Sequence, residues 1–223
     1  MDSSKMTDKQ LVELYSRNYE KGYDNVSHIF DRFLDIIGDH NIPPILDSLK
    51  KYEVPKEAKI LEAGCGTGNI GRAALQAGYA DLEGFEPSAK MIEEAKKKNV
   101  FKKIIQGFLT VPEEMPKEYE GAFDVVFSVG VFLHPNHAYA PAYECLLYAA
   151  KKGGLIMVST DEFDQTPGEK EYRIKREAME KEGKWELLEE RQVEKYQGIT
   201  KEIAPTGRYS TLRTDTFTVY RKL

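Results

Sequence analysis

The chain has 223 residues, of which 41% are hydrophobic, and it carries a net charge of −5. This length suits one domain with a buried core of its own, and the acidic balance disfavours nucleic acid as a bulk partner, because phosphate contacts require a basic surface. No apolar run approaches the roughly 18 residues of a membrane span, and the polar N-terminus has no apolar signal region, so membrane and secreted classes are set aside.

The first segment, residues 7–52, has the periodicity of helices. Gly38 can end one helix, and Pro43 suits the first turn of the next. Tyr15 and Tyr23 are eight residues apart, a spacing that places both on one helical face. The apolar residues that form helical stripes are Leu11, Leu14, Tyr15, Phe30, Phe33, Leu34 and Ile37.

After Pro55 the pattern changes to short apolar runs separated by helical segments. The runs predict strands at Ala58–Ala63, Ala80–Phe85, Lys103–Gln106, Phe123–Val129 and Leu155–Ser159. The segments between them predict helices at Asn69–Gly78, Ala89–Lys98 and Pro141–Ala150. Ser88 can cap the second of these helices. Such alternation predicts right-handed crossovers and a parallel sheet covered on both faces.

The tail differs from the middle of the chain. A charged helix is predicted at Lys170–Lys181, followed by strands at Leu187–Tyr196 and Thr216–Tyr220 with a long connection. Two such strands suggest an antiparallel pair at the edge of the sheet. The predicted fold class is therefore α/β: a doubly wound, mostly parallel, seven-stranded Rossmann-like sheet with an antiparallel edge strand and N-terminal helices.

The turn after the first strand contains two overlapping glycine patterns. Gly66-x-Gly68-x-x-Gly71 matches a dinucleotide fingerprint, whose pyrophosphate would lie at a helix N-terminus. Glu62-x-Gly64-x-Gly66-x-Gly68 instead places an acid before three alternating glycines. An acid in this loop disfavours a pyrophosphate but suits S-adenosylmethionine (SAM), which has no phosphate and carries an ammonium and a sulfonium.

The second strand supplies a further acid. Glu86 lies at its end, 18 residues beyond Gly68, where an acid can accept hydrogen bonds from the two ribose hydroxyls. Met91 follows on the next helix, where it can pack against adenine or into the core. Both positions lie at the carboxyl ends of the strands, where sheets of this kind bind ligands.

These motifs resemble those of the class I SAM-dependent methyltransferases. The matching stretches follow the order and spacing of that family over residues 58–160, and they are Leu61–Gly68, Gly84–Met91, Phe123–Phe127 and Lys152–Leu155. More narrowly, residues 14–15 and 23–24, together with Trp185, resemble the methyltransferase-like proteins of the Williams–Beuren region group.

The resemblance implies SAM as cofactor and S-adenosylhomocysteine (SAH) as product. The glycines would wrap the methionine moiety, Glu86 would hold the ribose, and the backbone at Ser128 would meet the methionine amino group. The family's frequent aspartate after the third strand is absent, so adenine would be recognised by packing and backbone contacts. The implied cofactor-binding residues are Glu62, Gly64, Gly66, Gly68, Glu86, Pro87, Met91, Phe108, Leu109 and Ser128.

Three residues are candidates for the acceptor side. His134 follows the fourth strand, where the methyl donor should point, and can contact the substrate or act as a base. Tyr15 and Tyr23 are candidates for a lid, by analogy with the family. The competing interpretation is that His134 is a structural hydrogen-bond donor and that the tyrosines are packing residues. No HExxH or CxxC spacing points to a metal site.

We therefore expect a SAM-dependent methyltransferase that acts on the nitrogen or oxygen of a small molecule. The single domain divides into a helical lid segment (1–55), a SAM-binding core (56–160) and a substrate-side helix with closing strands (161–223). The alternatives are an NAD-dependent oxidoreductase, a protein or tRNA methyltransferase, and a non-catalytic adenosine-ligand sensor. Two cysteines, too few for a disulfide framework, indicate a cytoplasmic protein, and we expect a monomer or homodimer.

Overall fold

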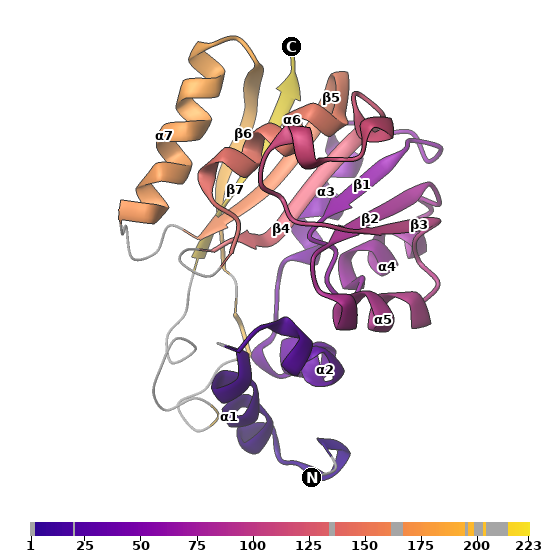
Figure 1. The fold of residues 1–223 in the computed structure, drawn as a ribbon, viewed down its shortest axis with the longest axis vertical. Coiled ribbons are helices and arrows are strands. Elements are labelled where there is room, and N and C mark those ends of the chain that lie inside the picture. Colours follow the sequence, from indigo (N-terminus) through magenta and orange to yellow (C-terminus); the bar gives the residue numbers. More distant parts are fainter. Residues whose placement is uncertain are drawn as a thin grey trace.

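The structure, a computed structural model, describes residues 3–19, 21–133, 137–161, 167–194, 196–198, 203 and 214–223. A seven-stranded sheet lies at its centre, with helices on both sides (Figure 1). The strands are β1 (Ile60–Ala63), β2 (Leu82–Glu86), β3 (Lys103–Gln106), β4 (Phe123–Phe132), β5 (Ala150–Asp161), β6 (Trp185–Glu194) and β7 (Thr214–Lys222). The α-helices are α1 (Asp8–Tyr19), α2 (Ser27–Ile37), α3 (Ile42–Lys51), α4 (Asn69–Gln76), α5 (Ala89–Lys97), α6 (Tyr143–Ala149) and α7 (Pro167–Lys181).

The strand order is β3-β2-β1-β4-β5-β7-β6. Strands β1 to β5 pair in parallel, whereas β7 runs antiparallel to both β5 and β6. This arrangement confirms the predicted doubly wound, mostly parallel sheet and its antiparallel closing pair. The last strand of the chain, β7, inserts between β5 and β6, so β6 forms the edge.

The two faces of the sheet are covered by different helices. On β1, Ile60 packs into an apolar cluster with Ala74 of α4, while its neighbour Leu61 packs into a second cluster with Leu146 of α6 and Trp185 at the start of β6. Successive side chains of a strand point to opposite faces, so a strand that is buried on both faces is apolar throughout. Ile60, Leu61 and Ala63 of β1 follow this rule, and Glu62 is the one buried charged residue of the strand.

The strands stand where the sequence predicts them, but several are longer. The fourth continues from Val129 to Phe132, which pairs with Thr160, and the fifth extends over Ala150–Asp161. Asp161 at its end pairs with Asp215 of β7. Backbone pairing with neighbouring strands extends β4 through Gly130 and β5 through Gly153 and Gly154, the glycines at which the predicted strands stop.

The N-terminal helices form a separate group beside the sheet (Figure 1). We call α1, the short 3-10 turn η2 (Tyr23–Asn25) and α2 the lid. It has an apolar cluster of its own, which includes Met91 of α5. As predicted, Gly38 ends α2, with φ of 63° and ψ of 54°. No helix within the described ranges is long and apolar enough to cross a membrane.

Candidate active site

The loop between β1 and α4 is shaped by three glycines. Gly64, Gly66 and Gly68 have φ angles of 81°, 51° and 79°, which residues with a Cβ rarely adopt. A Cβ at Gly64 would clash with Cγ2 of Val131, whereas the nearest heavy atom to a Cβ at Gly66 would be 4.0 Å away, on Phe30. Gly64 thus permits close packing on β4, and Gly66 leaves open space that a ligand can fill.

The carboxylate of Glu62 lies beneath this loop. Its side chain is only 3% exposed, and its Oε2 has no hydrogen-bond partner among the described residues. Burial raises the pKa of Glu62 well above its ordinary value, and the nearby charge of Glu86 adds to the increase. The backbone N–H of Gly71 and the charge of Lys98 offset only part of this increase, so Glu62 is suited to receive a cation or a hydrogen-bond donor from a ligand.

Glu86 lies at the end of β2 and faces the same loop. Its carboxylate accepts hydrogen bonds from the backbone N–H groups of Gly66 at 2.9 Å and of Ser88 at 3.0 Å. Burial raises its pKa above the ordinary value. Each carboxylate oxygen can accept more than one hydrogen bond, so Glu86 retains capacity for the hydroxyls of a ligand. The hydroxyl of Ser88 accepts from the N–H of Met91 at 3.1 Å, which confirms the predicted helix cap.

The lid is fastened to the core at these same loops. Asp24 accepts a hydrogen bond of 2.5 Å from the hydroxyl of Ser88, next to Glu86. Asp31 of α2 accepts one of 2.5 Å from the hydroxyl of Thr67 in the glycine loop, and it forms an ion pair of 2.6 Å with Lys98. Sequence reasoning missed both aspartates, because no local pattern connects residues so far apart in the chain.

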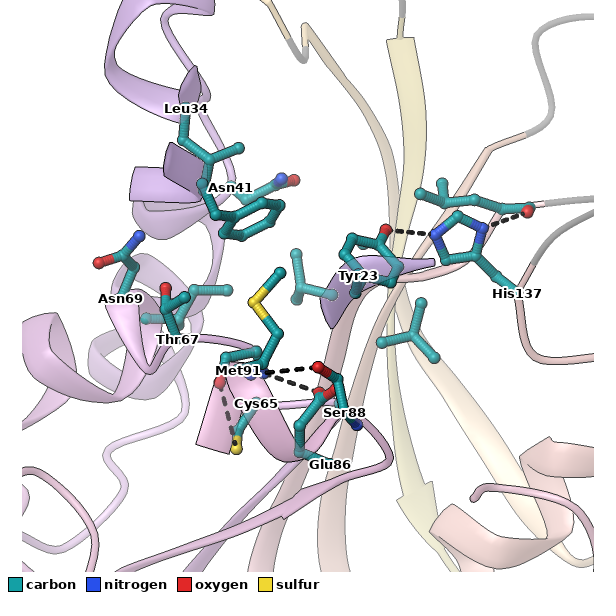
Figure 2. A pocket seen from close by; sticks show the side chains of 18 of the residues that line it. Tyr23, Leu34, Asn41, Cys65, Thr67, Asn69, Glu86, Ser88, Met91 and His137 are labelled. Carbon is teal, nitrogen blue, oxygen red and sulfur yellow. Dashed lines mark hydrogen bonds between the residues drawn. The ribbon is translucent and has the colours of Figure 1, made fainter. Parts of the chain in front are cut away.

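The lid, the glycine loop and the strand ends together line a cavity of about 920 Å³ (Figure 2). This volume is typical of a site for a small molecule or cofactor. Ten of the residues predicted from the sequence line the cavity: Tyr15, Tyr23, Glu62, Gly64, Gly66, Glu86, Pro87, Met91, Phe108 and Leu109.

The remaining predicted residues lie elsewhere. Gly68 is the N-cap residue of α4 and does not line the cavity. Ser128 is fully buried and donates a hydrogen bond of 2.7 Å to the carbonyl of Ala63, while its neighbour Val129 lines the cavity. His134 lies outside the described residues.

The two tyrosines do not share a helical face, so that expectation is wrong. Helix α1 ends at Tyr19, and Gly22, with φ of 103°, redirects the chain before Tyr23. Both tyrosines nevertheless line the cavity, since the lid folds back on itself. Tyr15 is 2% exposed and stacks on Phe33, with ring centroids 3.6 Å apart.

Tyr23 makes a contact across the cavity that joins the lid to the segment after β4. Its hydroxyl lies 2.5 Å from Nε2 of His137, whose Nδ1 lies 2.9 Å from the carbonyl of Leu133 (Figure 2). The sequence analysis singled out His134, and nothing in the sequence pointed to this contact of His137, three residues further along the chain.

The core of the chain matches a known family. Residues 60–154 match the family model of a methyltransferase domain. This match supports the interpretation of the chain as a class I SAM-dependent methyltransferase.

Named relatives agree with this assignment. Human methyltransferase-like protein 27 is 28% identical over 135 residues, which cover 60% of this chain and 54% of that protein. It fits the narrower resemblance to the Williams–Beuren region group. The tRNA U34 carboxymethyltransferase of Helicobacter pylori (strain HPAG1) is 29% identical over 164 residues, which cover 71% of this methyltransferase and 60% of the relative. The chain thus spans less than two thirds of the length of either relative.

A solved structure shares the fold. A putative RNA methyltransferase from Pyrococcus horikoshii superposes with a TM-score of 0.59 at 14% identity, over 81% of this chain and 82% of that chain. The two proteins therefore share the arrangement of the central sheet and its flanking helices.

The cavity residues fit SAM, the cofactor of this family. The buried, unpartnered oxygen of Glu62 suits a cationic ligand, and the open side of Gly66 leaves room for the ligand to approach the backbone. Glu86 suits a ribose diol, and the buried Met91 offers an apolar surface to a base. Within the described part of the chain, no group of three or more His, Cys, Asp or Glu residues could hold a metal ion.

Proposed function

We propose that this methyltransferase transfers the methyl group of SAM to a nitrogen or oxygen of a small molecule. The observation that carries the proposal is the cavity that the lid, the glycine loop and both glutamates line together. Of the cofactor-binding residues predicted from the sequence, eight line this one cavity: Glu62, Gly64, Gly66, Glu86, Pro87, Met91, Phe108 and Leu109.

The protein's contribution to the reaction is the alignment of the donor and the acceptor in this pocket. SAM supplies an electrophilic methyl carbon on a sulfonium, so the chain must hold an acceptor in line with it at a separation of ~3–3.5 Å. Glu62 and Glu86 hold the donor. Tyr15 and Tyr23 form the acceptor's wall on the lid side, and a base from the segment after β4, for which the sequence predicted His134, is proposed to remove a proton from the acceptor where one must leave.

The charge of the cavity supports a small neutral or cationic acceptor. Its described lining contains six carboxylates, at Asp24, Asp31, Asp35, Asp39, Glu62 and Glu86. Against them stand two constitutively basic side chains, Lys21 and Arg72. A phosphate-rich substrate would meet repulsion here, because nucleic-acid sites depend on basic contacts.

A tRNA substrate is the second candidate, favoured by the name of the Helicobacter relative. Filter binding with total tRNA at physiological salt distinguishes a tRNA substrate from a small-molecule substrate. We expect no saturable binding to tRNA. Micromolar binding that weakens steeply with added salt would favour the RNA substrate instead.

The proposal is tested by ligand binding followed by turnover. SAM and SAH should raise the melting temperature, and NAD should not, which would also exclude the oxidoreductase. Labelled SAM should then mark at least one member of a panel of amines and phenols. Saturable binding without turnover across a broad panel would favour a ligand sensor over an enzyme. We also propose a cytoplasmic location, which the two free cysteines support.

A further inference from the structure

The contact of His137 with the carbonyl of Leu133 sets the roles of both ring nitrogens in the neutral imidazole. The carbonyl of Leu133 can only accept a hydrogen bond, so Nδ1 of His137, 2.9 Å away, carries the proton of the neutral ring. Nε2 then presents a lone pair, and the Tyr23 hydroxyl donates to it at 2.5 Å. The backbone thus holds His137 in the tautomer that accepts a proton from Tyr23.

Both side chains line the cavity, and each comes from a different part of the chain. Tyr23 lies on the lid, and His137 lies on the segment after β4, with the two rings in edge-to-face contact at 5.6 Å between centroids (Figure 2). A phenol that donates its proton can still accept hydrogen bonds through its oxygen. Tyr23 is therefore placed to accept from an N–H or O–H group in the cavity while donating to His137.

We propose that Tyr23 and His137 form a proton-accepting pair for the methyl acceptor. This inference rests on the proposed function. As the lone pair of the acceptor bonds to the methyl carbon, the carbon–sulfur bond breaks and its electron pair stays on sulfur, giving SAH. The acceptor's proton passes to the oxygen of Tyr23, and the phenol proton passes to Nε2 of His137, which becomes an imidazolium. Tyr23 touches the substrate, and His137 acts through Tyr23 as a positioning residue and final proton acceptor.

The first test requires no turnover. Two-bond ¹H–¹⁵N spectra of the full chain, with and without SAH, report the tautomer of each histidine, and His137→Gln identifies the signals of residue 137. We expect the Nδ1–H tautomer at His137 and a changed Nε2 shift in Tyr23→Phe. An Nε2–H tautomer that is unaffected by Tyr23→Phe would overturn the inference. This result stands apart from the proposed function, which fails if the wild-type protein binds no SAH.

The second test separates proton transfer from lid closure. Glutamine can accept from Tyr23 through its amide oxygen and donate to Leu133, but it cannot take up a proton. With an amine or phenol from the panel that is methylated, His137→Gln should keep SAH affinity within about threefold and lower kcat by about 10²-fold or more. His137→Ala should lose both SAH affinity and turnover, and added imidazole should restore part of the kcat of this variant. His28→Gln, on an exposed position of α2, is the matched control and should behave as wild type. Wild-type kcat in His137→Gln would overturn the inference.

Discussion

The carboxylate of Asp31, on α2, accepts a hydrogen bond of 2.5 Å from the hydroxyl of Thr67, in the glycine loop. The same carboxylate accepts one of 2.9 Å from the side-chain amide of Asn69 and lies 2.6 Å from Nζ of Lys98. One lid residue thus contacts both the loop and the first turn of α4. The position of the lid and the shape of the glycine loop are therefore coupled through Asp31.

Asp31→Asn should loosen the lid. Burial raises the pKa of Asp31, but the hydrogen bonds and charge of Lys98 and the hydroxyl of Thr67 outweigh it, so the pKa lies below its ordinary value. The charged form therefore contributes stability above pH ~3.9, and this contribution is lost as the pH falls through the lower folded-state pKa. We expect a cost of about 1–2 kcal/mol at pH 7 that shrinks at acid pH, measured by urea unfolding.

Asp8→Asn is the control for this prediction. Asp8 also lies on the lid and pairs with Arg32 at 3.3 Å, but its side chain is 57% exposed. A surface ion pair of this kind contributes ~0–1 kcal/mol. Equal costs for the two substitutions would show that Asp31 does not connect the lid to the loop.

Glu62→Gln should stabilise the protein without ligand and weaken its binding of SAH. The raised pKa of Glu62 means that the folded chain still holds a proton at pH values where the unfolded chain has released it. The contribution of Glu62 to the free energy of unfolding is therefore lost as the pH rises above ~4.3. Removing the charge should therefore raise stability at pH 7 by about 1 kcal/mol, or ~2–4 °C in melting temperature. Scanning calorimetry from pH 5 to 8 should show the gain increase with pH.

The matched control is Glu57→Gln, at an exposed position just before β1. It should change neither the melting temperature nor the affinity for SAH. A Glu62→Gln protein that is less stable than wild type and still binds SAH normally would mean that the buried carboxylate serves the fold and not a ligand.

Alanine at the two loop glycines should separate folding from binding. Both positions have positive φ, which costs an alanine roughly 1–2 kcal/mol. At Gly64 the new Cβ also clashes with Val131, so Gly64→Ala should unfold at markedly lower urea concentration. At Gly66 the Cβ meets only open space, so Gly66→Ala should stay folded while its affinity for SAH falls at least tenfold. Equal affinity in Gly66→Ala and wild type would place the ligand elsewhere.

Tyr15 should stabilise the lid through the packing of its aromatic ring. The ring stacks on Phe33 within the buried cluster of the lid. Tyr15→Ala should therefore cost ~3–5 kcal/mol and expose the lid to limited proteolysis, whereas Tyr15→Phe keeps the stack and should protect the lid as wild type does. If Tyr15→Phe lowers turnover but leaves the lid protected, then the hydroxyl itself takes part in the reaction.

Much of the fold could be predicted because its signals are local. The apolar runs around Ile60 and Val125, the cap at Ser88 and the left-handed Gly38 each depend on a few neighbouring residues, and each was found in its place. The extensions of β4 and β5 could not be predicted, since pairing with neighbouring strands determines them.

The cofactor side of the site was more predictable than the acceptor side. The acid–glycine pattern puts Glu62 and Gly66 into one loop, and Glu86 follows at the end of the next strand. The lid's position depends instead on single contacts between distant residues, such as Asp24 with Ser88 and Tyr23 with His137. No spacing in the chain indicates these pairs, because packing of the lid on the strand ends brings them together.

The most direct test that Glu62 and Glu86 hold the cofactor is a calorimetric titration of SAH into the wild-type chain and into a Glu62→Gln, Glu86→Gln double variant. We expect saturable binding at one site in the wild type. In a double variant that remains folded, we expect a dissociation constant that is at least 100-fold higher. Absence of SAH binding by a folded wild-type chain, or equal binding by both proteins, would contradict this role of the two glutamates.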